Sequence, residues 1–258
     1  MALNGVIMQT WILTFNRPLA LNRLIETLGR QGIRSNIFSN HPDVYLSEES
    51  EKYVDKIIKN TLNSPESNSW CARSWNTIMM KAFEEDNELV CIQDDTAVTE
   101  RFAMWLETNK QKYDFIWGPA GDQFFFTRFD VLKTTGWWDE RYIGCYCGDA
   151  DWMKRVFHAW DKDRISVVDT HDWGFVHNDC GIQYIINTHA KGIDPNYENQ
   201  NEELQRKAPA TMICAQQHFI SKWGRPLNGT GPVNQNDERR LIEIEWYPWF
   251  SSKHGFGN

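Results

Sequence analysis

The feature that most constrains the fold of this chain is a regular alternation of short apolar runs with helix-spaced segments. The strand-like runs share a high content of Val, Ile, Leu and Phe and lie at residues 6–15, 35–40, 55–60 and 89–92. Between them, apolar side chains recur at i, i+3, i+4 and i+7, as from Leu21 to Leu28. Strands that alternate with helices form a mostly parallel sheet with right-handed crossovers. The pattern therefore predicts an α/β fold, a Rossmann-like sheet flanked by helices.

The alternation changes from Gly121 onward. A strand at 122–128 and a short helix at 129–136 are followed by a loop, a helix that begins near Asp149, a strand at 164–169 and a helix at 211–223. We expect these to form a mixed extension of the sheet. With 258 residues, 41% of them hydrophobic, the chain is long enough for one substantial core. We predict a single domain over 1–225, in two halves at 1–120 and 121–225, and a C-terminal extension at 226–258.

Charge and composition narrow the partners and the compartment. The net charge of −8 provides no bulk attraction to nucleic acid, although the C-terminal part is locally more basic. The first residues lack the basic start and apolar run of a signal peptide, and no stretch approaches the ~20 apolar residues of a transmembrane helix. The six cysteines are then expected to be free thiols in a reducing compartment. These features favour a cytoplasmic protein, in the host cytoplasm if the chain is viral.

Two adjacent carboxylates follow an apolar strand in the stretch "ELVCIQDDTAVTERF", residues 88–102. Like charges at Asp94 and Asp95 repel, so either both face solvent in a turn or a cation lies between them. Ligands of open parallel sheets bind at the carboxyl ends of strands, which favours a working site here. Carboxylate oxygens suit Mg²⁺ or Mn²⁺, metals often shared with substrate phosphates. The residues that follow, 96–98, are expected to lead into a helix.

A third carboxylate, Asp149, begins the helix in "CYCGDADWMKR". A helix N-terminus favours the ionised form of a carboxylate, which can then accept a proton from a hydroxyl group. A cap without a catalytic role is the alternative. Asp151 is the next candidate base, on the same turn. Trp137 and Trp138 are candidates for stacking on a substrate from a loop, whereas Trp152 is expected mainly to pack in the core.

Four stretches together resemble nucleotide-sugar-dependent glycosyltransferases of the GT-A fold, inverting and family-2-like. They are "ILTFNRPLALNRLIETL", "SWCARSWNTIMMKAFEEDNELVCIQDD", "FFFTRFDVLKTTGWWDERYIGCYCGDADWMKR" and "FISKWG". Their order and spacing, over roughly residues 8–224, are more specific than any one of them. The resemblance implies a nucleotide-sugar half at 1–120 and an acceptor half at 121–225. The chain departs from the family at Gln93, where many members carry an acid, and at Gly148, where many carry Glu.

The resemblance also implies roles for individual residues. Those that would hold the nucleotide sugar are Thr14, Phe15, Asn16, Arg17, Asn40, Arg73, Asn76 and Asp94, with Asp94 on the ribose or a metal-bound water. Asp95 and His177 would bind Mn²⁺ or Mg²⁺, with His171 as the competitor of His177. Asp149, with Asp151 beside it, would be catalytic, and Trp137, Trp138 and Trp152 would face the acceptor. UDP is the expected nucleotide of the donor. The base itself is left open, because Asn40 stands where many members use Asp to read uracil.

The function expected from this resemblance is metal-dependent, inverting transfer of a sugar from a nucleotide-diphosphate sugar to an acceptor hydroxyl. The acceptor is left open among glycans, lipid-linked sugars, proteins and small molecules. The same chemistry on a hydroxymethylated base of phage or viral DNA is one alternative. A non-catalytic sugar- or nucleotide-binding domain is another. A sugar-nucleotide-forming nucleotidyltransferase fits less well, because "TFNRPLALNR" lacks a Gly-rich basic loop.

Overall fold

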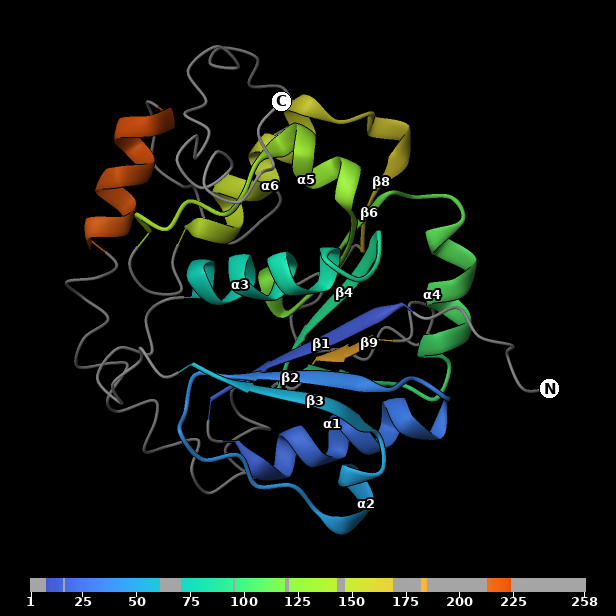
Figure 1. The fold of residues 1–258 in the computed structure, drawn as a ribbon. Helices are drawn as coiled ribbons and strands as arrows, with labels where there is room; N and C mark the ends of the chain where they lie inside the picture. Colours follow the sequence, from blue (N-terminus) through green and yellow to red (C-terminus); the bar gives the residue numbers. More distant parts are fainter. Residues whose placement is uncertain are drawn as a thin grey trace.

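The centre of the molecule is a seven-stranded sheet in the order β3-β2-β1-β4-β7-β6-β8 (Figure 1). A computed structural model describes residues 8–15, 17–60, 71–94, 96–118, 121–142, 147–168, 182–184 and 213–223. The strands are β1 (Gln9–Thr14), β2 (Ser35–Ser39), β3 (Val54–Lys59), β4 (Glu88–Gln93), β6 (Phe115–Trp117), β7 (Phe124–Arg128) and β8 (Ile165–Val167). β7 runs antiparallel to its neighbours β4 and β6, and the other pairs are parallel. The predicted α/β fold with a mostly parallel sheet is confirmed.

Helices cover both faces of this sheet. They are α1 (Pro18–Arg30), α2 (Glu48–Glu51), α3 (Cys71–Phe83), α4 (Phe102–Lys110), α5 (Phe129–Thr135), α6 (Gly148–Ala159) and a helix at residues 213–223. Two short 3₁₀ turns are η2 (Gly121–Gln123) and η3 (Lys162–Arg164). In Figure 1, α1 and α2 lie below the sheet and α3, α5 and α6 above it. Because β4 pairs with β7, the segments before and after residue 120 share one sheet.

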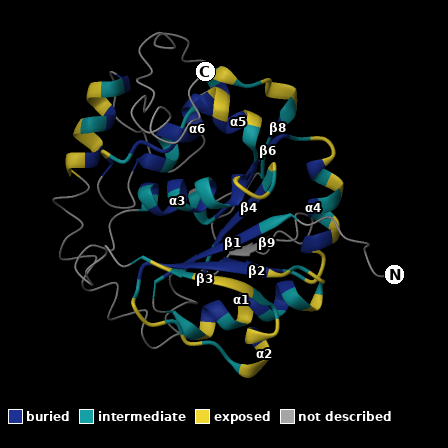
Figure 2. Ribbon diagram, viewed as in Figure 1, coloured by how far each residue is buried: buried dark blue, intermediate teal, exposed yellow. Residues whose placement is uncertain are grey.

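The strands supply both halves of the core because successive side chains point to opposite faces. In β1, Trp11 and Leu13 pack with side chains of α3, α5 and α6, whereas Ile12 packs with those of α1 and α4. Figure 2 shows the result as buried central strands between helices whose outer faces are exposed, with the edge strand β3 itself largely exposed. A strand buried on both faces needs a continuous apolar run, which is the pattern present in β4.

One local feature was not predicted. Residues Thr96–Val98 form a short strand, β5, before the expected helix α4 begins at Phe102. This strand pairs antiparallel with β9 (Ile182–Tyr184) in a separate two-stranded sheet. All three residues of β5 are buried, and two of them, Thr96 and Val98, are β-branched. Such side chains favour extended backbone, and the partner strand lies too far along the chain for the local sequence to indicate the pairing.

Helix length bears on a membrane location. Within the described ranges, no helix is long and apolar enough to cross a bilayer. The longest helices of the described residues, α1 and α3, have 13 residues each, against the ~20 that a span requires. Both are amphipathic and turn their apolar sides to the sheet.

Candidate functional site

The sheet has a topological switch point between β1 and β4. The chain moves outward from β1 through β2 to β3, and β4 then pairs on the other side of β1. In open α/β sheets, ligands bind outside the carboxyl ends of the strands at such a point, because the crossovers diverge there. β1 ends at Thr14 and β4 ends at Gln93. The candidate site is therefore the edge of the sheet where Thr14 and Asp94 lie, called the carboxyl edge below.

Asp94 ties the turn after β1 to the end of β4. The residue is 3% exposed, and its carboxylate accepts hydrogen bonds from Thr14 Oγ1 (2.6 Å) and the Phe15 backbone N–H (3.2 Å). Arg17 NH1 donates to the other carboxylate oxygen at 3.0 Å and forms an ion pair with it. These donors offset the cost of burying the charge. Asp94 was expected to contact a ribose or a metal-bound water, but here it shapes the turn that carries Thr14, Phe15 and Arg17.

Replacing Asp94 by asparagine should therefore affect stability first. The amide keeps the size of the carboxylate but removes its charge from three donors, one of them a largely buried guanidinium. Hydrogen bonds to charged groups contribute about 1.5–3 kcal/mol, so we expect a loss of that order in the free energy of unfolding. Urea denaturation measures it. Asp43→Asn, at an exposed position, is the control and should change stability by less than about 0.5 kcal/mol. Equal, small effects of both substitutions would contradict the assigned role.

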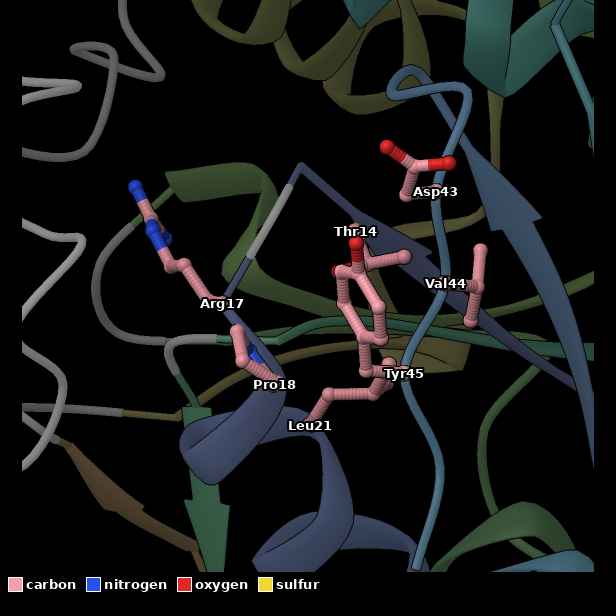
Figure 3. Close-up of a pocket in the computed structure, with 7 residues that line it drawn as sticks. All are labelled: Thr14, Arg17, Pro18, Leu21, Asp43, Val44 and Tyr45. Carbon is pink, nitrogen blue, oxygen red and sulfur yellow. The ribbon is translucent and has the colours of Figure 1, made fainter.

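A small depression adjoins this turn. Its lining residues come from the end of β1, the start of α1 and the segment that follows β2: Thr14, Arg17, Pro18, Leu21, Asp43, Val44 and Tyr45 (Figure 3). The guanidinium of Arg17 points away from the Tyr45 ring in this view, and Tyr45 is 60% exposed. At about 10 Å³ the depression is near the smallest cavity that holds one water. The depression as it stands is too small for a nucleotide.

Asn40 lies at the carboxyl end of β2, beside the turn after β1. Its backbone N–H donates to the Thr14 carbonyl at 3.0 Å. Its Oδ1 accepts from Ser74 Oγ at 2.9 Å and from Asn60 Nδ2 at 3.0 Å. The side chain is 3% exposed and joins β2 to the first turn of α3. The structure thus brings Asn40 and Thr14 together, as expected for neighbouring strand ends.

Arg73 and Asn76, which were also predicted to bind the nucleotide sugar, lie on α3. Asn76 is 1% exposed and is fully engaged: Nδ2 donates to the Trp138 carbonyl (2.9 Å) and Glu140 Oε1 (3.0 Å), and Oδ1 accepts from the Trp138 N–H (2.9 Å). A nucleotide-binding role for Asn76 is therefore corrected: the amide holds the 138–140 segment. The Arg73 side chain is 43% exposed, with its Nε 3.7 Å from Glu140 Oε2.

The three tryptophans expected at an acceptor surface are core residues. Trp137, Trp138 and Trp152 are 4%, 1% and 0% exposed. The rings of Trp138 and Trp152 pack with their centroids 5.2 Å apart, and Trp152 Nε1 donates to the Gly136 carbonyl at 3.0 Å. The stacking platform predicted for Trp137 and Trp138 is corrected, and so is an acceptor-facing position of Trp152, which packs in the core as its sequence context indicated. Large aromatic rings gain more from burial against the sheet than an exposed loop would provide.

Asp149 lies in the first turn of α6, at the same edge of the sheet as Asp94. The direction of α6 shows this: Trp160, just after its end, donates to Asp114 Oδ2 at 3.3 Å, and Asp114 directly precedes β6. The helix therefore ends at the amino edge and begins at the carboxyl edge. The entry to the helix is constrained, because Cys147 has a φ of 64°, a left-handed conformation unfavourable for a non-glycine residue.

A helix N-terminus alone would lower the pKa of Asp149, but in the structure the pKa is shifted in the opposite direction. Although the residue is only half-buried, desolvation of its carboxylate raises its pKa above the ordinary value. The N–H groups of Ala150 and of Asp149 itself act in the opposite direction, and the charge of Asp151 adds to the rise. The net shift is upward. A base whose pKa is moved toward neutrality is better matched to proton transfer near pH 7.

Asp151 is a structural ion-pair residue and not an alternative base. It is 0% exposed, and its Oδ2 accepts from Arg155 Nε at 3.1 Å. Its Oδ1 lies 2.9 Å from Lys222 Nζ and accepts from Trp223 Nε1 at 2.8 Å. Burial alone would raise the pKa of this carboxyl, but Arg155 and Lys222 outweigh it and lower the pKa. A low-pKa carboxylate with every neighbour donating to it is a poor proton acceptor, so the catalytic prediction for Asp151 is corrected.

Sequence reasoning missed Asp139. Its carboxylate is 1% exposed and accepts from Arg141 Nε (2.9 Å) and NH2 (2.8 Å), with Lys222 Nζ at 2.9 Å and His218 Nε2 at 3.2 Å. Burial opposes ionisation, but the hydrogen bonds from His218 and Arg141 and the charge of Lys222 hold the pKa well below its usual range. The partners at 218 and 222 lie about 80 residues away in sequence, so no local pattern indicates them.

Asn16, Asp95, His171 and His177 lie outside the described residues, so the predicted metal ligands have no place in the geometry above. Among the residues that the structure describes, no group of three or more His, Cys, Asp or Glu side chains could hold a metal ion.

Comparison of the chain with protein-family models and with curated proteins found no match. The assignment of a function therefore depends on the sheet topology and on the side chains at its carboxyl edge.

Proposed function

We propose that this chain is an inverting glycosyltransferase of the GT-A fold, which moves a sugar from a nucleotide-diphosphate sugar, with UDP as the expected nucleotide, to an acceptor hydroxyl. The observation that carries the proposal is that two features lie at the same edge of the sheet. The Asp94-anchored turn occupies the switch point, where a nucleotide would bind, and Asp149 begins α6 at the same edge.

The chemistry follows from this arrangement. The half-buried Asp149 carboxylate, with its raised pKa, would accept the proton of the acceptor hydroxyl as the oxygen attacks the anomeric carbon. The bond to the nucleotide diphosphate breaks on the opposite face. One displacement with one base inverts the anomeric centre. Asp94, at the same edge, is engaged by three donors and would not serve as a nucleophile.

Asp95 and His177 would hold the divalent cation. Because Asp94 is occupied by Thr14, Phe15 and Arg17, the adjacent Asp95 is the member of the pair left to bind a metal. A carboxylate with an imidazole suits Mn²⁺ better than Mg²⁺. When bound, such an ion would supply positive charge next to the donor diphosphate.

Calorimetric titration with UDP tests the donor half of the proposal. We expect UDP to bind in the presence of Mn²⁺ and to lose about tenfold or more in affinity, ~1.4 kcal/mol, when EDTA removes the metal. Asp95→Ala should abolish the difference between the two conditions. Asp163→Ala, on an exposed turn before β8, is the control and should bind as the wild type does.

Equal UDP affinity with and without the metal would contradict the cation role. A subsequent screen of UDP-, GDP- and CDP-sugars, with NMR detection of the released nucleotide, decides whether the site is catalytic. Metal-dependent binding without turnover of any donor or acceptor would favour the non-catalytic sugar- or nucleotide-binding alternative.

A further inference from the structure

The helix at 213–223 docks on the segment that leads into α6. Its buried side chains, Ala215, Phe219 and Trp223, form a separate apolar cluster with Tyr142 and Cys147. The Tyr142 and His218 rings meet edge to face, with their centroids 4.7 Å apart. The contact is thus made with Tyr142 and with the left-handed Cys147, which directly precedes α6.

Buried charge fixes the register of this contact. Lys222 Nζ lies 2.9 Å from Asp139 Oδ2 and 2.9 Å from Asp151 Oδ1, and its side chain is only 7% exposed. A single ammonium group therefore links two buried carboxylates from different segments. Buried ion pairs add little net stability, because desolvation offsets their attraction, but they strongly disfavour any arrangement that leaves a charge unpaired.

Trp223 adds a directional bond to the same carboxylate. Its Nε1 donates to Asp151 Oδ1 at 2.8 Å, and Lys154 of α6 places its Nζ 4.4 Å from the centre of the Trp223 ring. Tyr142 OH is also 3.2 Å from Asp151 Oδ1. Three groups outside α6 thus contact Oδ1 of Asp151, which lies two residues after Asp149 on the same turn.

We propose that Lys222 and Trp223 are positioning residues for Asp149: by holding Asp151 from the 213–223 helix, they fix the first turn of α6 and with it the direction of the Asp149 carboxylate. The inference rests on the proposed function, because it assigns Asp149 as the base. It makes the candidate active site dependent on a helix more than 60 residues further along the chain. The strained entry at Cys147 supports it, since a left-handed non-glycine residue persists only where surrounding contacts hold it.

Hydrogen–deuterium exchange on the full-length protein tests the positioning without any substrate. Trp223→Phe keeps an aromatic ring, although a smaller one, and removes the donor to Asp151, and Lys222→Met removes the shared cation. We expect the α6 amides from Asp151 onward, the first of which donates to the Cys147 carbonyl at 2.9 Å, to exchange about tenfold faster in both variants, while those of β1 and β4 keep the wild-type rate. Lys222→Arg should restore most of the protection. Gln217→Ala, at an exposed position of the same helix, is the matched control.

A general loss of stability would instead accelerate exchange in the central strands as well, and that result, or unchanged exchange in α6, would overturn the proposal. If Lys222→Met fails to fold, Trp223→Phe decides. With a donor that the wild type turns over, Trp223→Phe should lower kcat about tenfold and leave the donor KM unchanged. Absence of turnover in the wild type would count against the proposed function alone, because the exchange measurement is independent of it.

Discussion

Replacement of Asp149 by asparagine is expected to lower turnover by about 10²- to 10⁴-fold, the usual cost of losing a general base. The amide has the size of the carboxylate but cannot accept the proton of the acceptor hydroxyl. Donor affinity should stay within about threefold, ~0.7 kcal/mol, because the turn held by Asp94 is unchanged. Single-turnover kinetics with a UDP-sugar, together with UDP calorimetry, separates the two effects. Asp130→Asn, an exposed aspartate in the first turn of α5, is the matched control.

Near-wild-type turnover in Asp149→Asn would contradict the assignment, as would a product with the anomeric configuration of the donor. The pH dependence provides a second check. The base must be ionised, and burial raises its pKa, so the acid limb of kcat/KM should lie above the ~3.9 of an ordinary aspartate. The same shift makes the ionised carboxylate unfavourable in the folded state. Its contribution to stability is present at low pH and is lost as pH rises through the raised pKa, so Asp149→Asn should not destabilise the protein at pH 7.

The opposite result is expected for Asp151, two residues away. Asp151→Asn removes a fully buried charge from between Arg155 and Lys222 and leaves both cations under-compensated. Breaking a buried pair in this way costs about 3–5 kcal/mol, which urea denaturation measures directly. Because the folded pKa of Asp151 is lowered, its contribution to stability is present above the unfolded pKa of ~3.9 and is lost as pH falls through the folded value. As pH rises, the stability contributed by Asp151 therefore increases, whereas that contributed by Asp149 decreases.

Asp130→Asn serves again as the control, because Asp130 also pairs with a cation on its own helix, Lys133, but at a largely exposed position. Surface pairs of this kind contribute about 0–1 kcal/mol. A similar, small loss for Asp151→Asn would show that the Asp151–Lys222 contact does not hold the two helices together. A large loss of turnover without a loss of stability would return Asp151 to the list of candidate bases.

The fold was largely predictable from the sequence because its determinants are local. Apolar runs such as β4 and amphipathic helices such as α1 show their period directly. The spatial order of the strands, and with it the switch point, became known only from the structure. The small sheet of β5 and β9 was not predictable, since three extended residues acquire their partner from a segment more than 80 positions away. The sequence indicated β7 as a strand but did not show that it runs antiparallel to β4.

The candidate site divides in the same way. The sequence by itself determined which residue types follow the strand ends, and so indicated Thr14, Asn40, Asp94 and the position of Asp149 at a helix start. Only the tertiary structure decided what those side chains do. In the structure, Asp94 bonds to the turn after β1 and Trp138 lies in the core. Asp149 and Asp151 have different roles because they have different hydrogen-bond and ion-pair partners. The physical reason is that hydrogen bonding, burial and the pKa of a carboxyl depend on neighbours in space, and Lys222 reaches Asp151 only once two distant helices have packed together.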